Sequence, residues 1–297
     1  MTRNMLPIAW VSAYAFARDT EEDVMSDVIE WQRWAKARDE QIGAEYGPLS
    51  LTALHWLSDE DQNFPGVPGS WRAEPAVADG ESSQGDSAAI AAAFGTVTVT
   101  ADSSEGIEID GRVVSGSVRV STESDIQARV GDVIVEIIER DGSHAIRVRD
   151  PKAPARLAFT TLPRYDFDPA WRLTARFDAL VEPREITVGS VVDGITHQST
   201  VGGEIAFTVD GSEHRLTAFG DVDHLWILFR DATSGVTTPG AARSLRVDRP
   251  AEDGTVVLDF NRASCLPCAF NDYSTCPLPP PNNRLPIPVH TGERSPE

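Results

Sequence analysis

Short segments rich in β-branched residues, separated by Asp-Gly turns, constrain the fold of this chain more than any other feature. A first series lies at residues 96–100, 106–109, 113–120, 132–138 and 145–148. A second lies at 172–177, 185–188, 196–201, 204–209, 214–219, 224–229 and 255–260. Asp-Gly pairs at 141–142, 210–211 and 253–254 are typical of tight hairpin turns. Because no strand-helix-strand rhythm accompanies these segments, we expect antiparallel pairing.

The prediction is a mainly β fold: an N-terminal helix followed by two antiparallel β units, sandwich or barrel-like, closed by an irregular Pro-rich C-terminal segment. The helix is indicated by apolar positions at helical spacing from Val24 to Ile42, with Thr20 and Asp23 as a capping pair. Residues 50–57 are expected to form a second helical turn. The three consecutive prolines at 279–281 fix an extended backbone, and we expect that tail to be ordered over the second β unit.

Composition divides the chain into three parts. Residues 1–23 are expected to be a disordered or mis-started tail, 24–160 the helix plus the first β unit, and 161–293 the second β unit with its closing segment. Residues 65–93 are rich in Pro, Gly, Ser and acid and are predicted to be a loop. We favour a tail over a signal peptide for the apolar stretch at 5–17, because it follows a single Arg and contains Pro7.

The net charge excludes several partners. With 26 Lys and Arg against 46 Asp and Glu the formal charge is −20, so the surface repels nucleic-acid phosphates and anionic lipids. No apolar run reaches the roughly 18 residues that a membrane span needs. We therefore expect a soluble, cytoplasmic protein with no nucleic-acid or membrane partner.

Familiar catalytic and cofactor signatures are missing: we find no nucleophile elbow, zinc-protease helix, phosphate loop or dinucleotide fingerprint, and we expect no cofactor. Cys265, Cys268 and Cys276, with His290 downstream, could supply four zinc ligands. Their spacing matches no common zinc module, so we favour buried thiols and predict no metal. A disulfide between Cys268 and Cys276 is conceivable only if the protein leaves the cytosol.

Arginine and acidic residues on predicted strands form another candidate constellation. One stretch holds Arg147, Arg149, Asp150 and Arg156, and another holds Arg230, Asp231, Arg243, Asp259 and Asn261. Any single pair is explained by structural ion pairing, because buried charges must be paired. Several arginines converging on one opening would instead favour a small anion.

These same residues resemble a known family. The segments at 146–151, 168–172, 175–177 and 229–235, and above all 257–263, 267–270, 276–281 and 283–285, ending at Gly292-Glu293, are similar to a bacterial family catalogued as domain of unknown function 1684. The resemblance covers most of residues 25–293. It brings a name but no reaction. Pro239, Ala242 and Cys265 depart from the family pattern, and a pocket that depended on those positions would be altered here.

Our leading hypothesis is a site for a small polar or anionic metabolite in the second β unit. Its candidate residues are Arg230, Asp231, Thr233, Arg243, Asp259, Asn261, Cys268 and Tyr273. A metal-independent enzymatic version makes Asp259 a general base, Arg230 and Arg243 anion clamps, and Cys268 or Tyr273 a proton donor or nucleophile. The alternative is a non-catalytic ligand-sensing or partner-binding β module whose signature residues are structural. The sequence names no catalytic residue that would decide between them.

Overall fold

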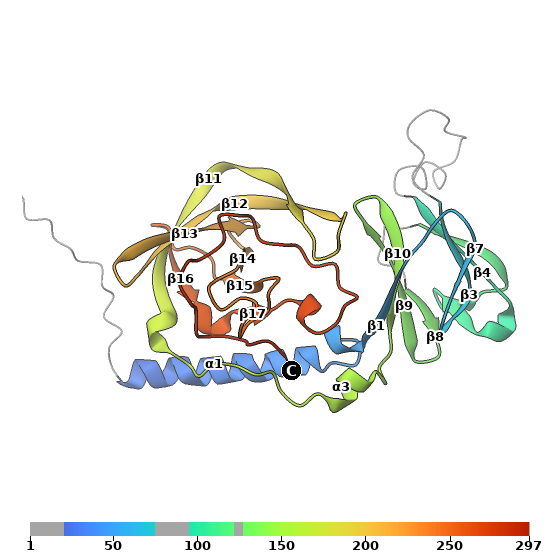
Figure 1. The fold of residues 1–297 in the computed structure, drawn as a ribbon, viewed down its shortest axis with the longest axis horizontal. Coiled ribbons are helices and arrows are strands. Elements are labelled where there is room, and N and C mark those ends of the chain that lie inside the picture. The colour runs from blue at the N-terminus through green and yellow to red at the C-terminus, as the bar shows by residue number, and fades with distance from the viewer. Residues whose placement is uncertain (1–20, 75–94, 122–126, 297) are drawn as a thin grey trace, which may run out of the picture.

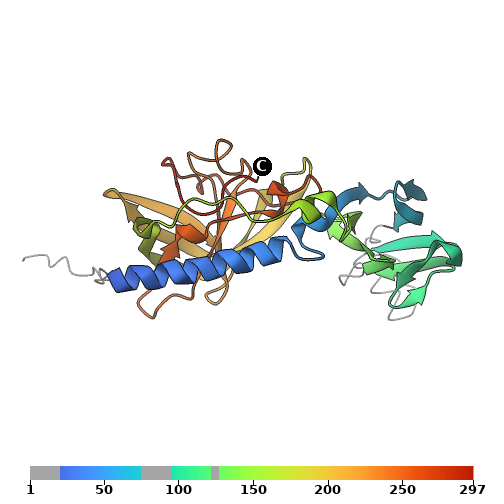
Figure 2. The same cartoon turned by 90° about the horizontal axis from the view of Figure 1, so that it is seen from below.

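The computed structural model describes residues 21–74, 95–121 and 127–296, and it places two β units next to each other along the longest axis of the molecule (Figure 1). Helix α1, Glu21–Ile42, runs along the second of these units, as both views show (Figure 2). The expected tail at 1–20, the capping residue Thr20 and most of the expected loop at 65–93 lie outside the described residues. In the described part of the chain, no helix has both the length and the apolar character that a membrane span needs.

The first β unit packs two antiparallel sheets face to face. Its strands are β1 Leu51–Trp56, β2 Gln62–Phe64, β3 Val67–Glu74, β4 Thr96–Ala101, β5 Ile107–Ile109, β6 Arg112–Val113, β7 Gly116–Ser121, β8 Gln127–Val130, β9 Val133–Arg140 and β10 Ser143–Arg149. Among the described residues the sheet orders are β1-β10-β9-β8-β5-β6 and β2-β3-β4-β7. Trp71 and Val99 from one sheet meet Ile137 and Ile146 from the other in a single buried cluster, as in a sandwich.

Two local predictions in this unit were wrong. Residues 51–56, expected to be helical, form β1, which pairs with β10 along most of its length. Residues 67–74, expected within a loop, form β3, in which every second residue is buried and the Trp71 side chain is fully enclosed. Gly69 has a φ of +74° and packs against the backbone carbonyl of Thr100, so the Pro and Gly that suggested a loop are accommodated inside a strand.

The second β unit is one curled antiparallel sheet. Its strands are β11 Arg172–Gly189, β12 Thr196–Val209, β13 Ser212–Phe219, β14 Leu225–Phe229, β15 Arg243–Val247, β16 Thr255–Asp259 and β17 Ser264–Cys265, with α3 Pro154–Ala158 in the connection from the first unit. Over the described residues their order is β16-β11-β12-β13-β14-β15-β17. Phe177, Ile205, Ile227 and Leu258, from strands across the whole sheet, share one core with Phe260. The predicted mainly β, antiparallel class is confirmed.

The ordered C-terminal tail closes this sheet. In the described residues the register of β13 and β14 holds a single pair, Phe219 with Trp226, so the two strands diverge. The buried side chain of Asn283 bridges the gap: its Oδ1 accepts from Thr217 N at 2.7 Å, and its Nδ2 donates to Thr217 O at 2.9 Å and Leu228 O at 2.8 Å. One amide therefore replaces the backbone hydrogen bonds that a neighbouring strand would make.

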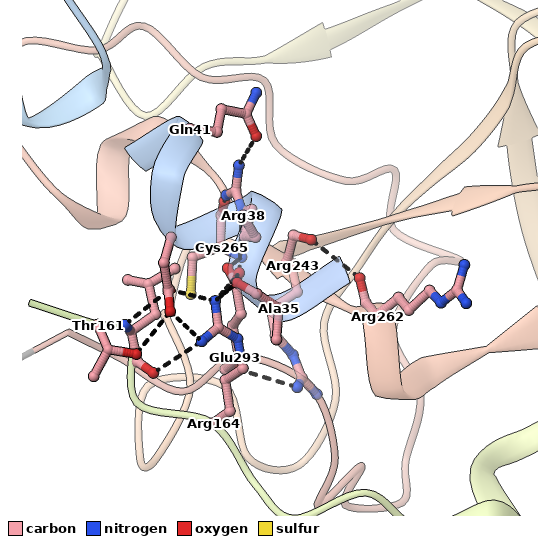
Figure 3. Close-up of polar contacts among 12 residues, drawn as sticks. Ala35, Arg38, Gln41, Thr161, Arg164, Arg243, Arg262, Cys265 and Glu293 are labelled. Carbon is pink, nitrogen blue, oxygen red and sulfur yellow. Dashed lines mark hydrogen bonds and ion pairs between the residues drawn. The ribbon is translucent and has the colours of Figure 1, made fainter. Parts of the chain in front are cut away.

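Helix α1 was grouped with the first β unit by sequence, but its side chains contact the second. Trp31 Nε1 donates to Asn261 O at 3.1 Å. The Glu293 side chain, fully buried, accepts from Arg38 Nε at 3.0 Å and from Cys265 N at 2.6 Å. Figure 3 shows Glu293 enclosed by Arg38 and Arg164, with Cys265 beside it. A carboxylate near the chain's end thus fastens α1 and β17 together.

Replacing Asn283 by Asp tests the bridge between β13 and β14. A carboxylate of the same shape cannot donate to Thr217 O and Leu228 O, which then remain buried without a donor. Each such carbonyl costs roughly 1–3 kcal/mol, so we expect the free energy of unfolding of the second β unit to fall by about 3 kcal/mol or more in urea titrations. The neighbouring exposed Asn282→Asp is the control, because its side chain makes one hydrogen bond, to Thr217 Oγ1 at 2.7 Å. Equal losses in the two variants would contradict this account.

Replacing Glu293 by Gln tests the clamp on α1. The change leaves the half-buried Arg38 guanidinium without its carboxylate, and breaking a buried ion pair costs about 3–5 kcal/mol. The matched control is Glu40→Gln on the same helix, whose carboxylate pairs with Lys36 at 3.9 Å in full solvent. We expect the control to stay within about 0.5 kcal/mol of the wild type by chemical denaturation. A Glu293→Gln protein as stable as the control would show that the clamp contributes nothing.

Candidate anion-binding cleft

A cleft of about 490 Å³ lies where the two β units meet. The first unit contributes Arg140 from the end of β9 and Arg147 and Arg149 from β10. The second contributes His197 from β12, and the tail contributes Ser274, Thr275 and Cys276. Among the described residues, this lining includes three arginines and no Asp or Glu. In a chain that carries 20 excess negative charges, the cleft is therefore a local positive region.

The alternation of side chains along β9 and β10 puts these arginines on one face. Ile146 and Val148 point into the sandwich core, so Arg147 and Arg149 between and after them point the other way, toward the second unit. Arg147 lies directly opposite Glu136 across the strand pair. The face of this sheet that points away from the sandwich core thus carries the arginine side chains.

The cluster has more cations than carboxylates to pair with them. Glu136 accepts from Arg149 Nε at 2.5 Å and lies 2.9 Å from Arg147 Nη2. Burial lowers the pKa of Arg147, Glu136 opposes this, and the repulsion from Arg149 and Arg140 lowers the pKa further. In the part of the chain that the structure describes, Arg147 Nε is buried and has no hydrogen-bond partner. A bound anion would satisfy that donor and reduce the repulsion.

The other two arginines are held in place by the backbone and the tail. Arg149 Nη1 donates to Tyr46 O at 3.2 Å and Gly47 O at 3.0 Å, which fixes the loop after α1. Arg140 Nε donates to Thr275 Oγ1 at 3.3 Å across the junction of the two units. These contacts preorganise the guanidinium groups, so a ligand need not order them.

His197 adds a neutral imidazole to the same cleft. Burial lowers its pKa, a hydrogen bond with the Thr275 backbone raises it, and the Arg140 charge lowers it again, so that the ring is neutral near pH 7. Its Nε2 is buried and, among the described residues, has no hydrogen-bond partner. Two unpartnered buried nitrogens, on Arg147 and His197, thus line one cleft, and groups of this kind call for a water or a ligand.

Two other hollows carry weaker arguments. A cleft of about 450 Å³ beneath α1 is lined by four arginines, but three are already paired with carboxylates: Arg38 with Glu293, Arg172 with Asp27 and Arg262 with Asp259. A hollow of about 560 Å³ on the second unit is lined by Arg176 and Arg215, which form exposed ion pairs with Asp178 and Glu213. In both places most of the arginines are already paired with acidic neighbours.

Three of the residues proposed from sequence come together in a buried network without a ligand. Arg243 Nη2 lies 2.5 Å from Asp231 Oδ2, and both side chains are almost fully enclosed. Asp231 Oδ1 accepts from Thr233 N and Oγ1, each at 2.6 Å. Arg243 also donates to Thr291 O at 2.5 Å and Val289 O at 3.0 Å. The network fastens the tail to β15, and every charge in it is satisfied.

Of the remaining proposed residues, Asp259 and Asn261 form a pair that adjoins this network through Thr291, and the others lie apart. Asn261 Nδ2 donates to Asp259 Oδ1 at 2.9 Å, and its Oδ1 accepts from Thr291 Oγ1 at 2.5 Å. Arg230 Nε donates to the backbone of Ala241 at 2.6 Å. Tyr273 lies on the surface with 36% of its area exposed. Cys268 donates its backbone N–H to Cys276 Sγ, beside the arginine cleft.

The zinc ligands considered from sequence do not gather. Cys265 Sγ donates to Arg294 O at 3.3 Å, and the exposed His290 ring lies 5.6 Å from the Tyr165 ring. Within the described ranges, no group of three or more His, Cys, Asp or Glu side chains is placed to hold a metal. Ala242 and Cys265, two of the departures from the family pattern, are buried where the tail crosses β15 and β17.

Sequence reasoning missed Arg140, His197, Thr275 and Cys276 as members of one site. The alternation within 133–140 and 143–149 could have placed Arg140 with Arg147 and Arg149 on one face. No comparable signal exists for His197, because it reaches the cleft only when the two units meet.

In comparisons with known proteins, the family match lies in the second half of the chain. The model of the family described as "Protein of unknown function (DUF1684)" matches residues 157–294. This range holds the second β unit and the tail, whereas the resemblance was expected over most of 25–293. The solution NMR structure of an uncharacterised protein from gene locus rrnAC0354 of Haloarcula marismortui is 32% identical, covers 47% of this chain and 78% of that one, and has a TM-score of 0.40. No curated protein matches the chain. Through residues 157–294, the chain belongs to the family described as protein of unknown function DUF1684.

Proposed function

We propose that this protein binds a small anion in the arginine cleft between its two β units. The observation that carries the proposal is the excess of cation: three guanidinium groups face one carboxylate, Glu136, in a protein whose surface is otherwise acidic. Natural selection for solubility does not require buried arginines that repel one another. An anionic ligand gives them a partner.

The dimensions and donors of the cleft suggest the class of ligand. A volume of about 490 Å³ suits a small metabolite. The unpartnered Nε of Arg147 suits a carboxylate or a phosphate, the anions to which arginine forms its strongest hydrogen bonds. The Thr275 hydroxyl and the His197 Nε2 then supply neutral polar contacts that fix the ligand's orientation.

For residues 157–294, which match the family, we propose a role in ligand binding and not catalysis by the signature residues. Asp231 and Arg243 neutralise each other, and Asp259 is held by Asn261 and Arg262. These contacts support the structural alternative for the signature residues of the second unit. The ligand site then depends on that unit mainly for His197 and the tail.

We further propose a cytoplasmic location without a nucleic-acid partner. The cysteines are free thiols, as expected in a reducing compartment. The charge of −20 opposes association with phosphate backbones.

Thermal unfolding with added inorganic phosphate, pyrophosphate or succinate tests the proposal. At a free concentration ten times Kd, a ligand stabilises the native state by about 1.4 kcal/mol, which corresponds to a rise in Tm of roughly 2–5 °C. We expect at least one of these anions to give such a rise, and titration calorimetry to give its affinity. If none of them raises Tm at millimolar concentration, the cleft is not an anion site.

The variant Arg147→Gln should weaken that anion's binding about tenfold or more, since a hydrogen bond to a charged group is worth roughly 1.5–3 kcal/mol. Glu136 keeps its pair with Arg149 in this variant, so the fold should survive. The matched control is Arg176→Gln, which removes an exposed arginine paired with Asp178 at 2.6 Å. Anion affinity that is equal in the two variants would place the binding site elsewhere.

A further inference from the structure

Two cysteine thiols meet at the edge of the arginine cleft. The backbone N–H of Cys268 donates to Cys276 Sγ at 3.3 Å, so the Cys276 sulfur lies against the backbone of Cys268. Cys276, which is 6% exposed, lines the cleft together with Arg147, whereas Cys268 is half-buried and is not part of the lining. The two cysteines are therefore neighbours, and Cys276 is the one that lines the space in which a ligand would lie.

The surroundings of the two thiols are unequal. The hydrogen bond from Cys268 lowers the pKa of Cys276, burial raises it, and the Cys268 N–H and the Arg147 charge lower it further, with a net decrease. The same hydrogen bond and burial raise the pKa of Cys268. Of the two thiols, Cys276 is therefore the one that loses its proton more readily.

Cys265 provides an internal contrast. Burial and the Glu293 carboxylate raise its pKa to about 12, and its thiol donates to the backbone of Arg294. It is 1% exposed and lines a different cleft, the one beneath α1. A reagent that oxidised every thiol indiscriminately would not distinguish these positions, but a specific reaction would leave Cys265 untouched.

We propose that Cys276 and Cys268 form a redox-active dithiol whose substrate is a small disulfide bearing carboxylate groups. This inference rests on the proposed anion cleft, because the arginines would hold the carboxylates while Cys276 attacks. In the first step the Cys276 thiolate bonds to one substrate sulfur, and the other sulfur leaves as a thiolate. In the second step Cys268 loses its proton to that leaving thiolate and attacks Cys276, which releases the second substrate sulfur as a thiolate that takes a proton from water. The products are one protein disulfide and two substrate thiols, and no further oxidant is needed.

The cleft supplies the selectivity of this reaction. A disulfide with carboxylates is attracted by the excess positive charge at Arg140, Arg147 and Arg149, and a cationic disulfide is repelled. Because the arginines are already fixed by Thr275 and by the loop after α1, the attraction costs little ordering. Charge, rather than the intrinsic reactivity of the disulfide, should therefore set the order of rates.

The test uses the full chain and three disulfides of different charge: oxidised glutathione, bis(hydroxyethyl) disulfide and cystamine. Mass spectrometry of the intact protein and of its peptides follows the reaction. With oxidised glutathione we expect the loss of two hydrogen atoms and a peptide crosslink between Cys268 and Cys276. The rate should exceed that with the neutral disulfide by at least about tenfold, the low end of electrostatic steering, and cystamine should be slowest.

Cysteine variants assign the steps. Cys268→Ser should stop at a glutathione adduct on Cys276, Cys276→Ser should give neither adduct nor crosslink, and Cys265→Ser should react like the wild type. In Arg147→Gln the ratio of anionic to neutral rates should fall toward one. An adduct on Cys265 or on Cys268 in place of Cys276 would overturn the assignment.

Two outcomes separate this inference from the proposed function. If phosphate or succinate binds as proposed but the Cys268–Cys276 crosslink does not form with any of the three disulfides, the dithiol inference fails and the anion site stands. If the crosslink forms equally fast with all three disulfides, the anionic substrate class is wrong, and the anion site loses support as well.

Discussion

The second β unit depends on its C-terminal tail, because the tail supplies the hydrogen bonds that its buried polar groups need. A curled sheet whose strands β13 and β14 diverge exposes backbone groups to the interior, where each unpaired one is costly. The amide of Asn283 meets three of them. Arg243 in turn donates to carbonyl groups of the tail, and the Glu293 carboxylate accepts from an N–H of β17. The tail acts as a strand substitute made of side chains.

The same tail builds one wall of the arginine cleft. After it leaves β17, the chain turns through Cys268 and brings Thr275 and Cys276 against the outer face of the sandwich. Arg140 bonds to Thr275 there, so the cleft and the junction of the two units are held by one contact network. A ligand in the cleft would touch both units, and its binding free energy would add to the stability of their association.

The fold class was predictable because strand alternation and Asp-Gly turns are local signals. At Asp141 and Asp210, φ is +53° and +49°, as the predicted tight turns require. β3 escaped prediction because its Pro and Gly lie at positions where the sandwich tolerates them, and packing around Trp71 overrides the local composition. The tail's order was predictable from its prolines and apolar residues such as Leu285, which is buried in the core. The meeting of His197 with Arg147 was not, because it depends on how two separately folded sheets dock.

The long separation between α1 and its partners also has a consequence for how the chain is made. The Trp31 indole donates to the Asn261 carbonyl, which lies 230 residues later in the sequence. Arg38 and its partner Glu293 are 255 residues apart. During synthesis the helix leaves the ribosome long before β16, β17 and the tail exist, so its apolar side has no surface to cover it. The sandwich, complete by about Arg149, can fold meanwhile. The helix then gains partners just after the sandwich, at Leu162 and Arg164, which bond to Asp39, and the last segment completes its contacts and closes the sheet.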